Sequence, residues 1–169
     1  HPDCVPCMIS PDRTTRGLIK MDGSSLSIEK IDVVFPVLHG KYGEDGTLQG
    51  LLEMSGIPYC GCGVIASAVC MDKVFANITF EHAGVPHAKW DFMMDYEISN
   101  FDAIAERVEK NLGYPIFVKP ANSGSSVGIS KATDRDALKT AVSSNFTRQA
   151  PLACFASSPI STVNVRDPC

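Results

Sequence analysis

The sequence contains no apolar run that approaches the ~20 residues needed to span a bilayer as a helix. Its first residues also lack the basic-then-apolar order of a secretory signal peptide. These two absences argue against a membrane-spanning or secreted protein. We therefore expect a cytoplasmic location and no membrane partner.

An excess of basic residues is also missing. The chain has 15 Lys and Arg against 19 Asp and Glu, which gives a net charge of −4 at pH 7. General affinity for nucleic acid rests on massed Lys and Arg, so we expect no nucleic-acid partner. The apolar share of 44% and the charged share of 20% are typical of a globular protein. A chain of 169 residues can form one domain or two small ones.

The seven cysteines do not form the even, closely spaced set of a disulfide framework. Cys4 and Cys7 form a C-x-x-C pair, and Cys60 and Cys62 form a C-x-C pair, but the two pairs lie too far apart in the sequence for a zinc ribbon. We expect no metal site among them. Reduced thiols, with Cys70 buried as a small apolar side chain, are the favoured interpretation.

Several short catalytic and binding motifs are absent as well. The chain has no G-x-x-x-x-G-K-[ST] loop and no G-x-G-x-x-G fingerprint. It also lacks the nucleophile elbow of the α/β hydrolases. A nucleotide site, if present, must therefore be built in another way.

The first half of the chain contains a series of short predicted elements. Residues 1–13 show no periodicity and are predicted to be irregular, and a hairpin is expected to turn at Asp22 and Gly23. The apolar run Asp32–Leu38 is predicted to be a strand buried on both faces of a parallel sheet, although Pro36 disfavours a central position. A helix over Thr47–Ser55, ended by Gly56, and an extended return over 57–61 would complete a βαβ-like unit.

The second half is predicted to begin near residues 67–72, where the composition changes. It combines helices and strands, with Asp72 and Asn100 as helix caps and a capping box at Thr133 and Asp136. After about Ser144 the periodicity is lost, and residues 145–169 are predicted to be unstructured or non-native. The predicted elements are a helix over Val64–Cys70, a helix from Lys73 to about Ala83, a strand over Ala88–Met94, a helix over Phe101–Leu112, two strands within Tyr114–Lys131 and a helix over Thr133–Val142.

The stretch Tyr114–Lys131 is the first candidate site. An apolar run ends in Lys119, and a loop of small residues at 123–126 follows before a second run begins. Small residues allow close approach of the backbone to a phosphate, and a lysine at a strand end supplies positive charge. Lys73, at a helix start, could add a second cation. The alternative for both lysines is an ordinary solvated surface position.

The glycine-rich loop from His39 to Gly46 is the second candidate. It follows a predicted strand, and ligands in α/β sheets gather beyond the carboxyl ends of strands. His39 with Glu44 and Asp45 could serve acid–base chemistry, a metal or a substrate ammonium group. A hydrogen-bonded loop histidine is the commoner case and stays open as the alternative.

Three segments in order, VVFPVLHGKYGEDGTLQGLLEMSGIPYCGCG, ASAVCMDK and FVKPANSGSSVGISK, resemble the D-alanine–D-alanine ligases. These are cytosolic ATP-grasp enzymes that make the terminal dipeptide of peptidoglycan. The resemblance runs from about Ser10 to Val142. The Lys-Tyr pair in the HGKYGEDG loop also resembles the glycopeptide (vancomycin) resistance branch, which accepts D-serine.

The resemblance implies a fold that is α/β and α+β. The C-terminal part of a Rossmann-like pre-ATP-grasp domain would occupy residues 14–68, and the small, N-lobe subdomain of the ATP-grasp would occupy residues 69–144. Family members are usually homodimers, so the resemblance also implies a homodimer.

The resemblance also implies roles for single residues. Lys73 and Lys119 match the lysines that contact the ATP phosphates. Ser125 matches the loop serine that helps hold the site closed, and Ser126 lies on the same phosphate-facing turn. His39 and Glu44 are implied only as residues that line the ligand cleft. The implied reaction phosphorylates the carboxylate of one D-alanine with ATP, with Mg2+ bridging the phosphates, before the amine of a second D-alanine attacks.

The sequence departs from the family pattern at both ends. Residues 1–13 lack the glycine-rich start of the family, and no magnesium-binding segment follows Ser143. We therefore expect an internal fragment that cannot ligate D-alanine alone. Another ATP-grasp carboxylate–amine ligase and a non-catalytic nucleotide-binding module are the alternatives.

Overall fold

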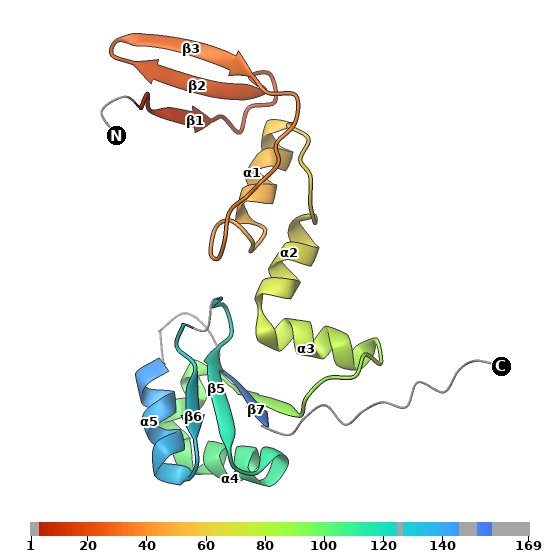
Figure 1. Cartoon of the computed structure of the whole chain (residues 1–169), viewed down its shortest axis with the longest axis vertical. Helices are drawn as coiled ribbons and strands as arrows, with labels where there is room; N and C mark the ends of the chain where they lie inside the picture. The colour runs from red at the N-terminus through yellow and green to blue at the C-terminus, as the bar shows by residue number, and fades with distance from the viewer. Residues whose placement is uncertain (1–3, 125–126, 146–151, 157–169) are drawn as a thin grey trace, which may run out of the picture. The chain divides into compact units, whose positions relative to one another are not determined.

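A computed structural model describes residues 4–124, 127–145 and 152–156 of the chain (Figure 1). The chain divides into two compact units between Ala68 and Val69. We call residues 1–68 the N-terminal unit and residues 69–169 the C-terminal unit.

A three-stranded antiparallel sheet opens the N-terminal unit. Its strands are β1 (Cys7–Ile9), β2 (Gly17–Asp22) and β3 (Ser25–Lys30), in the order β1-β2-β3. The predicted hairpin is confirmed, and Gly23 takes the positive φ of 58° that its turn requires. The prediction that residues 1–13 are irregular is wrong for β1. This strand is fixed by its pairing with β2, which local sequence periodicity does not reveal.

The predicted buried strand at Asp32–Leu38 is not formed. Val34 makes a single parallel bridge to Tyr59, whereas Phe35 and Val37 are 74% and 70% exposed. Pro36 has no N–H group to extend the ladder beyond this bridge. The described residues supply no second strand beside it, so the apolar side chains of this segment lie at the surface.

Helix α1 (Thr47–Ser55) lies in the sequence between Val34 and Tyr59, the two bridged residues. The predicted order of extended segment, helix and extended segment is therefore retained, but a single bridge joins the two extended segments in place of a ladder of hydrogen bonds. The helix ends as predicted at Gly56, which has a φ of 67° and donates its N–H to Glu53 O at 3.2 Å, and the next N–H, that of Ile57, donates to Leu52 O at 3.0 Å. The side chain of Leu52, within this helix, is fully buried. Helix α2 (Val64–Met71) follows and was also predicted.

Helix α3 (Lys73–His82) begins the C-terminal unit at Asp72, which is the predicted cap. The Asp72 Oδ1 atom accepts hydrogen bonds from Val74 N at 2.8 Å and from Phe75 N at 3.1 Å. These two N–H groups have no partner within the helix, so the carboxylate satisfies both of them. The start of α3 is therefore fixed by its own sequence.

A four-stranded sheet forms the centre of the C-terminal unit. Its strands are β4 (Trp90–Met93), β5 (Ile116–Pro120), β6 (Ser130–Ala132) and β7 (Leu152–Ala156), in the order β4-β7-β5-β6, and all pairs are antiparallel. The prediction of an unstructured tail from residue 145 is wrong for β7. This strand is defined by partners on both sides, which lie far from it in the sequence.

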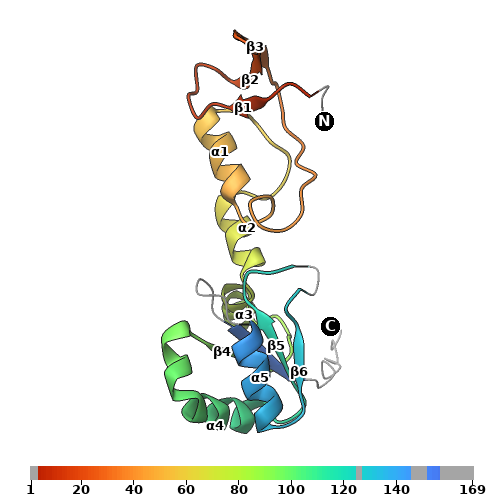
Figure 2. The same cartoon turned by 90° about the vertical axis from the view of Figure 1, so that its left-hand side faces the viewer.

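Helices α4 (Phe101–Leu112) and α5 (Arg135–Asn145) pack on one face of this sheet (Figures 1 and 2). A continuous core joins them to it through Met93, Ile104, Ala105, Val108, Ile116, Val118, Ala132, Leu138, Ala141 and Val142. A smaller cluster of Val74, Ala121 and Ala153 packs against Trp90 and Phe92. The predicted small sheet with helices on one side is thus confirmed for α4 and α5.

Two predicted caps differ in detail. Asn100 is the last residue of a 3-10 helix (Asp95–Asn100) and makes no capping hydrogen bond to α4. Helix α5 is capped by Asp134, whose Oδ1 accepts from Ala137 N at 2.8 Å, and not by Thr133. Asp and Thr are both common helix N-caps, so residue type does not tell which of the two caps the helix. The backbone conformation decides which side chain reaches the N–H groups of the first turn.

The thiols of Cys4, Cys7, Cys60, Cys62 and Cys70 are free. Cys70 is exposed, so the prediction of a buried Cys70 is wrong: α2 turns this face outward within the described residues. No helix among the described residues is long and apolar enough to cross a membrane.

Candidate functional site

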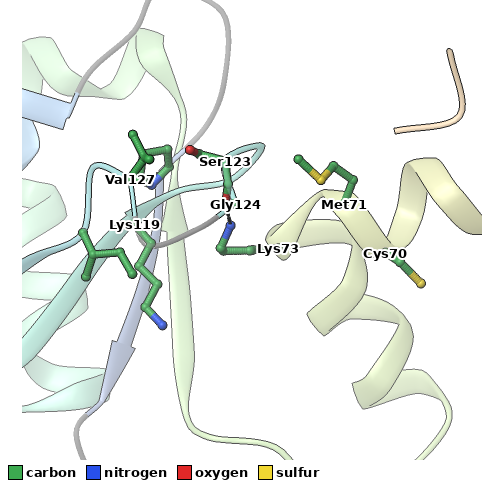
Figure 3. Close-up of a pocket in the computed structure, with 9 residues that line it drawn as sticks. Cys70, Met71, Lys73, Lys119, Ser123, Gly124 and Val127 are labelled. Atoms are coloured by element: carbon green, nitrogen blue, oxygen red, sulfur yellow. Dashed lines mark hydrogen bonds between the residues drawn. The ribbon is translucent and has the colours of Figure 1, made fainter. Parts of the chain in front are cut away.

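A cavity of about 300 Å³ lies in the C-terminal unit beside the loop that follows β5 (Figure 3). Two lysines, Lys73 and Lys119, reach it from different elements. The remaining lining residues come from the end of α2, the end of β5 and the β5–β6 connection, and they are Cys70, Met71, Pro120, Ser123, Gly124, Val127 and Ile129.

Lys119 reaches the cavity because of the alternation of side chains along β5. Ile116 and Val118 are fully buried in the core under α4 and α5. Successive side chains of a strand point to opposite faces, so Lys119 lies on the other face of the sheet. Across the sheet it is in register with Ala153, which is in register with Phe92. Lys119 is half-buried there.

Lys73 reaches the cavity from the first position of α3. Its Nζ atom donates to Ser123 O at 2.6 Å and to Ala121 O at 3.2 Å. Its backbone N–H also donates to Ala121 O, at 3.1 Å. Because an ammonium group has three N–H donors, these two side-chain bonds leave one donor that can face a ligand.

The electrostatics of Lys73 favour an anion in the cavity. Burial lowers the pKa of Lys73 from its usual value, and repulsion from the nearby Lys119 lowers it further, while Asp72 opposes both effects. Two positive groups close to each other in a partly desolvated cavity are stabilised by a negative ligand. A phosphate group therefore suits the site.

The start of α3 contributes no additional donors. Asp72 occupies the N–H groups of Val74 and Phe75, and Ala121 occupies that of Lys73. The positive charge that the described residues offer a ligand here therefore comes from lysine side chains and not from the helix end.

Sequence reasoning named Lys73 and Lys119, and the structure brings both to one cavity. Ser125 and Ser126, which were also named, lie outside the described residues. Sequence reasoning missed the carbonyl groups of Ala121 and Ser123, because a backbone acceptor leaves no mark on residue type. It also missed the apolar rim formed by Met71, Val127 and Ile129.

The second candidate, the His39–Gly46 loop, belongs to the N-terminal unit. Asp45 accepts from Tyr42 N at 2.8 Å and from Thr47 N at 3.0 Å. Burial alone would raise the pKa of Asp45, but these hydrogen bonds together hold it below its usual value. Its carboxylate therefore stabilises the loop as an anion.

His39 and Glu44 are both exposed on this loop. The Glu44 carboxylate accepts from the N–H of Gly40. The described residues contain no group of three or more His, Cys, Asp or Glu side chains that could hold a metal ion. The loop is thus an ordered surface feature with one histidine available to a ligand.

Two family descriptions match the chain. The D-ala D-ala ligase N-terminus matches residues 8–62, which include β2, β3, the HGKYGEDG loop and α1. The D-ala D-ala ligase C-terminus matches residues 79–152, which includes Lys119. Lys73 lies between the two matched segments.

Several known proteins are similar over most of this chain. A D-alanine–D-alanine ligase of Caldicellulosiruptor bescii is 52% identical over 143 residues, which cover 84% of this chain and 39% of the relative. The vancomycin B-type resistance protein VanB of Enterococcus faecalis is 46% identical over 140 residues, which cover 83% of this chain and 39% of that protein. The chain thus spans about two fifths of the length of the curated relatives it matches.

The fold matches the same group of enzymes. The crystal structure of the VanG D-Ala:D-Ser ligase of Enterococcus faecalis aligns with a TM-score of 0.81 and 37% identity, over 92% of this chain and 43% of that one. The predicted combination of a pre-ATP-grasp segment and a small ATP-grasp subdomain is confirmed. Two matched segments in the expected order, the relatives and the fold agree: the chain belongs to the D-alanine–D-alanine ligase family.

Proposed function

We propose that this chain provides the phosphate-binding elements of an ATP-dependent ligase that joins D-alanine to a second D-amino acid for peptidoglycan synthesis. The observation that carries the proposal is the convergence of Lys73 and Lys119 on one cavity of about 300 Å³. Two cations, with no acidic side chain among the described residues that line the cavity, suit a polyphosphate.

In this reaction ATP activates a D-alanine carboxylate as an acyl phosphate, and the amine of the second substrate displaces the phosphate. The residues of this chain would contribute charge and position. Lys73 and Lys119 would neutralise phosphate oxygens, and the Ser125 and Ser126 hydroxyls would contact the same phosphates. His39 and Glu44 are carried over from the family resemblance only as residues that would line the ligand cleft.

Magnesium would accompany the nucleotide and would supply positive charge to its phosphates. Among the described residues, no cluster of acidic, His or Cys side chains is suited to hold it. We therefore assign no ligand for Mg2+ among the described residues, and we expect the polypeptide by itself to bind nucleotide without ligating D-alanine. The complete enzyme would act in the cytoplasm as a homodimer.

D-alanine is the proposed second substrate, and D-serine is the alternative. The observation in support of D-serine is the structural likeness to VanG, which is described as a D-Ala:D-Ser ligase. Release of phosphate from ATP by the enzyme that contains this chain, measured with D-alanine alone and with D-alanine plus D-serine, distinguishes the two.

Nucleotide binding tests the proposal directly. Titration of the chain with a fluorescent ATP analogue should give saturable binding. Lys119→Ala should weaken binding by about 10- to 150-fold, since a hydrogen bond to a charged group contributes about 1.5–3 kcal/mol. Lys110→Ala, which removes an exposed lysine of α4 outside the cavity, is the matched control and should bind as the wild type does.

Two results would contradict the proposal. One is binding that responds equally to Lys119→Ala and Lys110→Ala, which would indicate attraction by net charge alone. The other is the absence of saturable binding by a chain whose circular dichroism spectrum is that of a folded protein.

A further inference from the structure

Lys73 donates hydrogen bonds to the protein itself, which a lysine that serves only to attract a ligand by its charge would not need. Its ammonium group donates to two carbonyl oxygens of the segment that follows β5, at Ser123 and Ala121. These partners lie 50 and 48 residues away in the sequence. Ala121 O accepts from both the backbone and the side chain of the same lysine. Lys73 therefore ties the start of α3 to the wall of the cavity (Figure 3).

The lysine itself is held firmly. Asn77 Nδ2 donates to Lys73 O at 2.6 Å, and Asp72 fixes the first turn of α3. Val74, the next residue, is 3% exposed and packs against Ala121 and Ala153. The backbone of Lys73 is therefore a rigid base from which its side chain can restrain a loop.

Apart from the lysine bonds, the described residues restrain the segment at 121–124 by the packing of Ala121 and by a hydrogen bond from Val127 N to Gly124 O at 3.1 Å. Ala121 is fully buried, but Asn122 and Gly124 are exposed, and a Cβ atom at Gly124 would meet nothing within 4 Å. Because the C=O and N–H groups of a trans peptide point in opposite directions, a fixed Ser123 O also fixes the direction of the Gly124 N–H. Loss of the lysine bonds would release both groups.

We propose that Lys73 is a positioning residue, whose ammonium group holds residues 121–124 in place as a wall of the cavity before any ligand binds. This role is separate from the contribution of its charge to phosphate binding. The identity of the ligand rests on the proposed function, whereas the positioning role concerns the protein without ligand.

Backbone mobility in the absence of nucleotide tests the inference. Order parameters from 15N relaxation should be near ~0.85 for Ser123 and Gly124 in the wild type and should fall toward ~0.6 in Lys73→Met. Lys73→Arg, which keeps a cation with several donors, should restore much of the loss. Lys110→Ala should leave both values unchanged, and Val118 and Ser130 in β5 and β6 report whether each variant is folded.

The outcomes separate this inference from the proposed function. Order parameters that stay at the wild-type value in a folded Lys73→Met protein would overturn the positioning role, even if ATP binding is weakened. Lower order parameters in a protein that binds no ATP in any form would support positioning and overturn the proposed function.

A measurement on the wild type covers the case in which Lys73→Met does not fold. The 13C′ resonances of Ala121 and Ser123 should shift together with the side-chain resonances of Lys73 as this lysine loses its proton at alkaline pH. Carbonyl resonances that do not follow the lysine would show that the ammonium group does not hold the segment, and would equally overturn the inference.

Discussion

Lys73 and Lys119 differ in how the fold presents them, although both carry the same charge. The side chain of Lys119 lies on the face of β5 opposite to the buried Ile116 and Val118, because side chains alternate between the two faces of a strand. Lys73 is directed by the cap at Asp72 and by its carbonyl partners at Ala121 and Ser123. The two positive charges repel each other, so the cavity favours an anion that can contact both lysines.

The lowered pKa of Lys73 predicts a pH dependence of nucleotide binding. Burial is the main cause and Lys119 the second, and Asp72 acts in the opposite direction. The folded protein holds this proton less tightly than the unfolded chain, so Lys73 reduces stability at neutral pH, and the reduction disappears as pH rises toward 10.5. A bound phosphate reverses the shift, so we expect the affinity for ATP to fall as pH rises through the lowered pKa.

Isothermal titration calorimetry in buffers of different ionisation enthalpy measures this effect, because binding should take up protons at the alkaline end of the range. Lys73→Arg is the control: a guanidinium group does not titrate there, so the affinity of this variant should depend less on pH than that of the wild type. Proton uptake of the same size in Lys73→Arg would assign the effect to another group.

At the scale of single elements, α1 shows how two glycines of one helix can have opposite roles. Gly50 lies inside the helix, and a Cβ atom there would meet nothing within 4 Å. Gly56 ends the helix with a φ of 67°, and a Cβ atom there would lie 3.3 Å from the side chain of Arg13. Arg13 itself donates to Glu53 O at 2.9 Å, so its side chain is not free to move away.

These two positions form a matched pair of substitutions. Gly50→Ala should raise the free energy of unfolding by about 0.5–1 kcal/mol, because alanine is favoured in a helix interior. Gly56→Ala should lower it by about 1 kcal/mol or more, because alanine disfavours positive φ. Urea denaturation followed by the circular dichroism of the helices measures both. Equal and same-signed effects would contradict the placement of Gly50 inside α1 and of Gly56 at its end.

At the scale of the whole molecule, the two units differ in their buried apolar content. Among the described residues of the N-terminal unit, the buried apolar side chains are those of Leu52 and Ile57. The C-terminal unit has the continuous core between its sheet and the α4 and α5 helices. Apolar burial is the main source of stability, so we expect the C-terminal unit to be the more stable of the two.

A pair of core substitutions tests this difference. Leu138→Ala should reduce the stability of the C-terminal unit by about 2–5 kcal/mol, because the leucine is fully buried, and should raise amide exchange in α4 and α5. Leu52→Ala should reduce the stability of the N-terminal unit and raise amide exchange in α1, because Leu52 is also fully buried. Leu26→Ala, at a side chain that is 73% exposed, should change little and serves as the control. Exchange that rises throughout the chain in both core variants would mean that the units do not unfold separately.

The sequence by itself determined the local structure and the lysines of the candidate site. The helix over Thr47–Ser55, the cap at Asp72 and the hairpin turn at Gly23 follow from side-chain periodicity, capping and backbone preferences that act over a few residues. The face of β5 that carries Lys119 follows from alternation of period two. The family resemblance rests on the same local segments.

Only the tertiary structure decided which distant segments meet. It placed β7 between β4 and β5, left the apolar side chains of Phe35 and Val37 at the surface, and brought Lys73 to the carbonyl groups of residues 121–123. Backbone pairing depends little on residue type, and a carbonyl acceptor belongs to every residue. For this reason the lysines could be named from the sequence, whereas the wall that they hold in place could not.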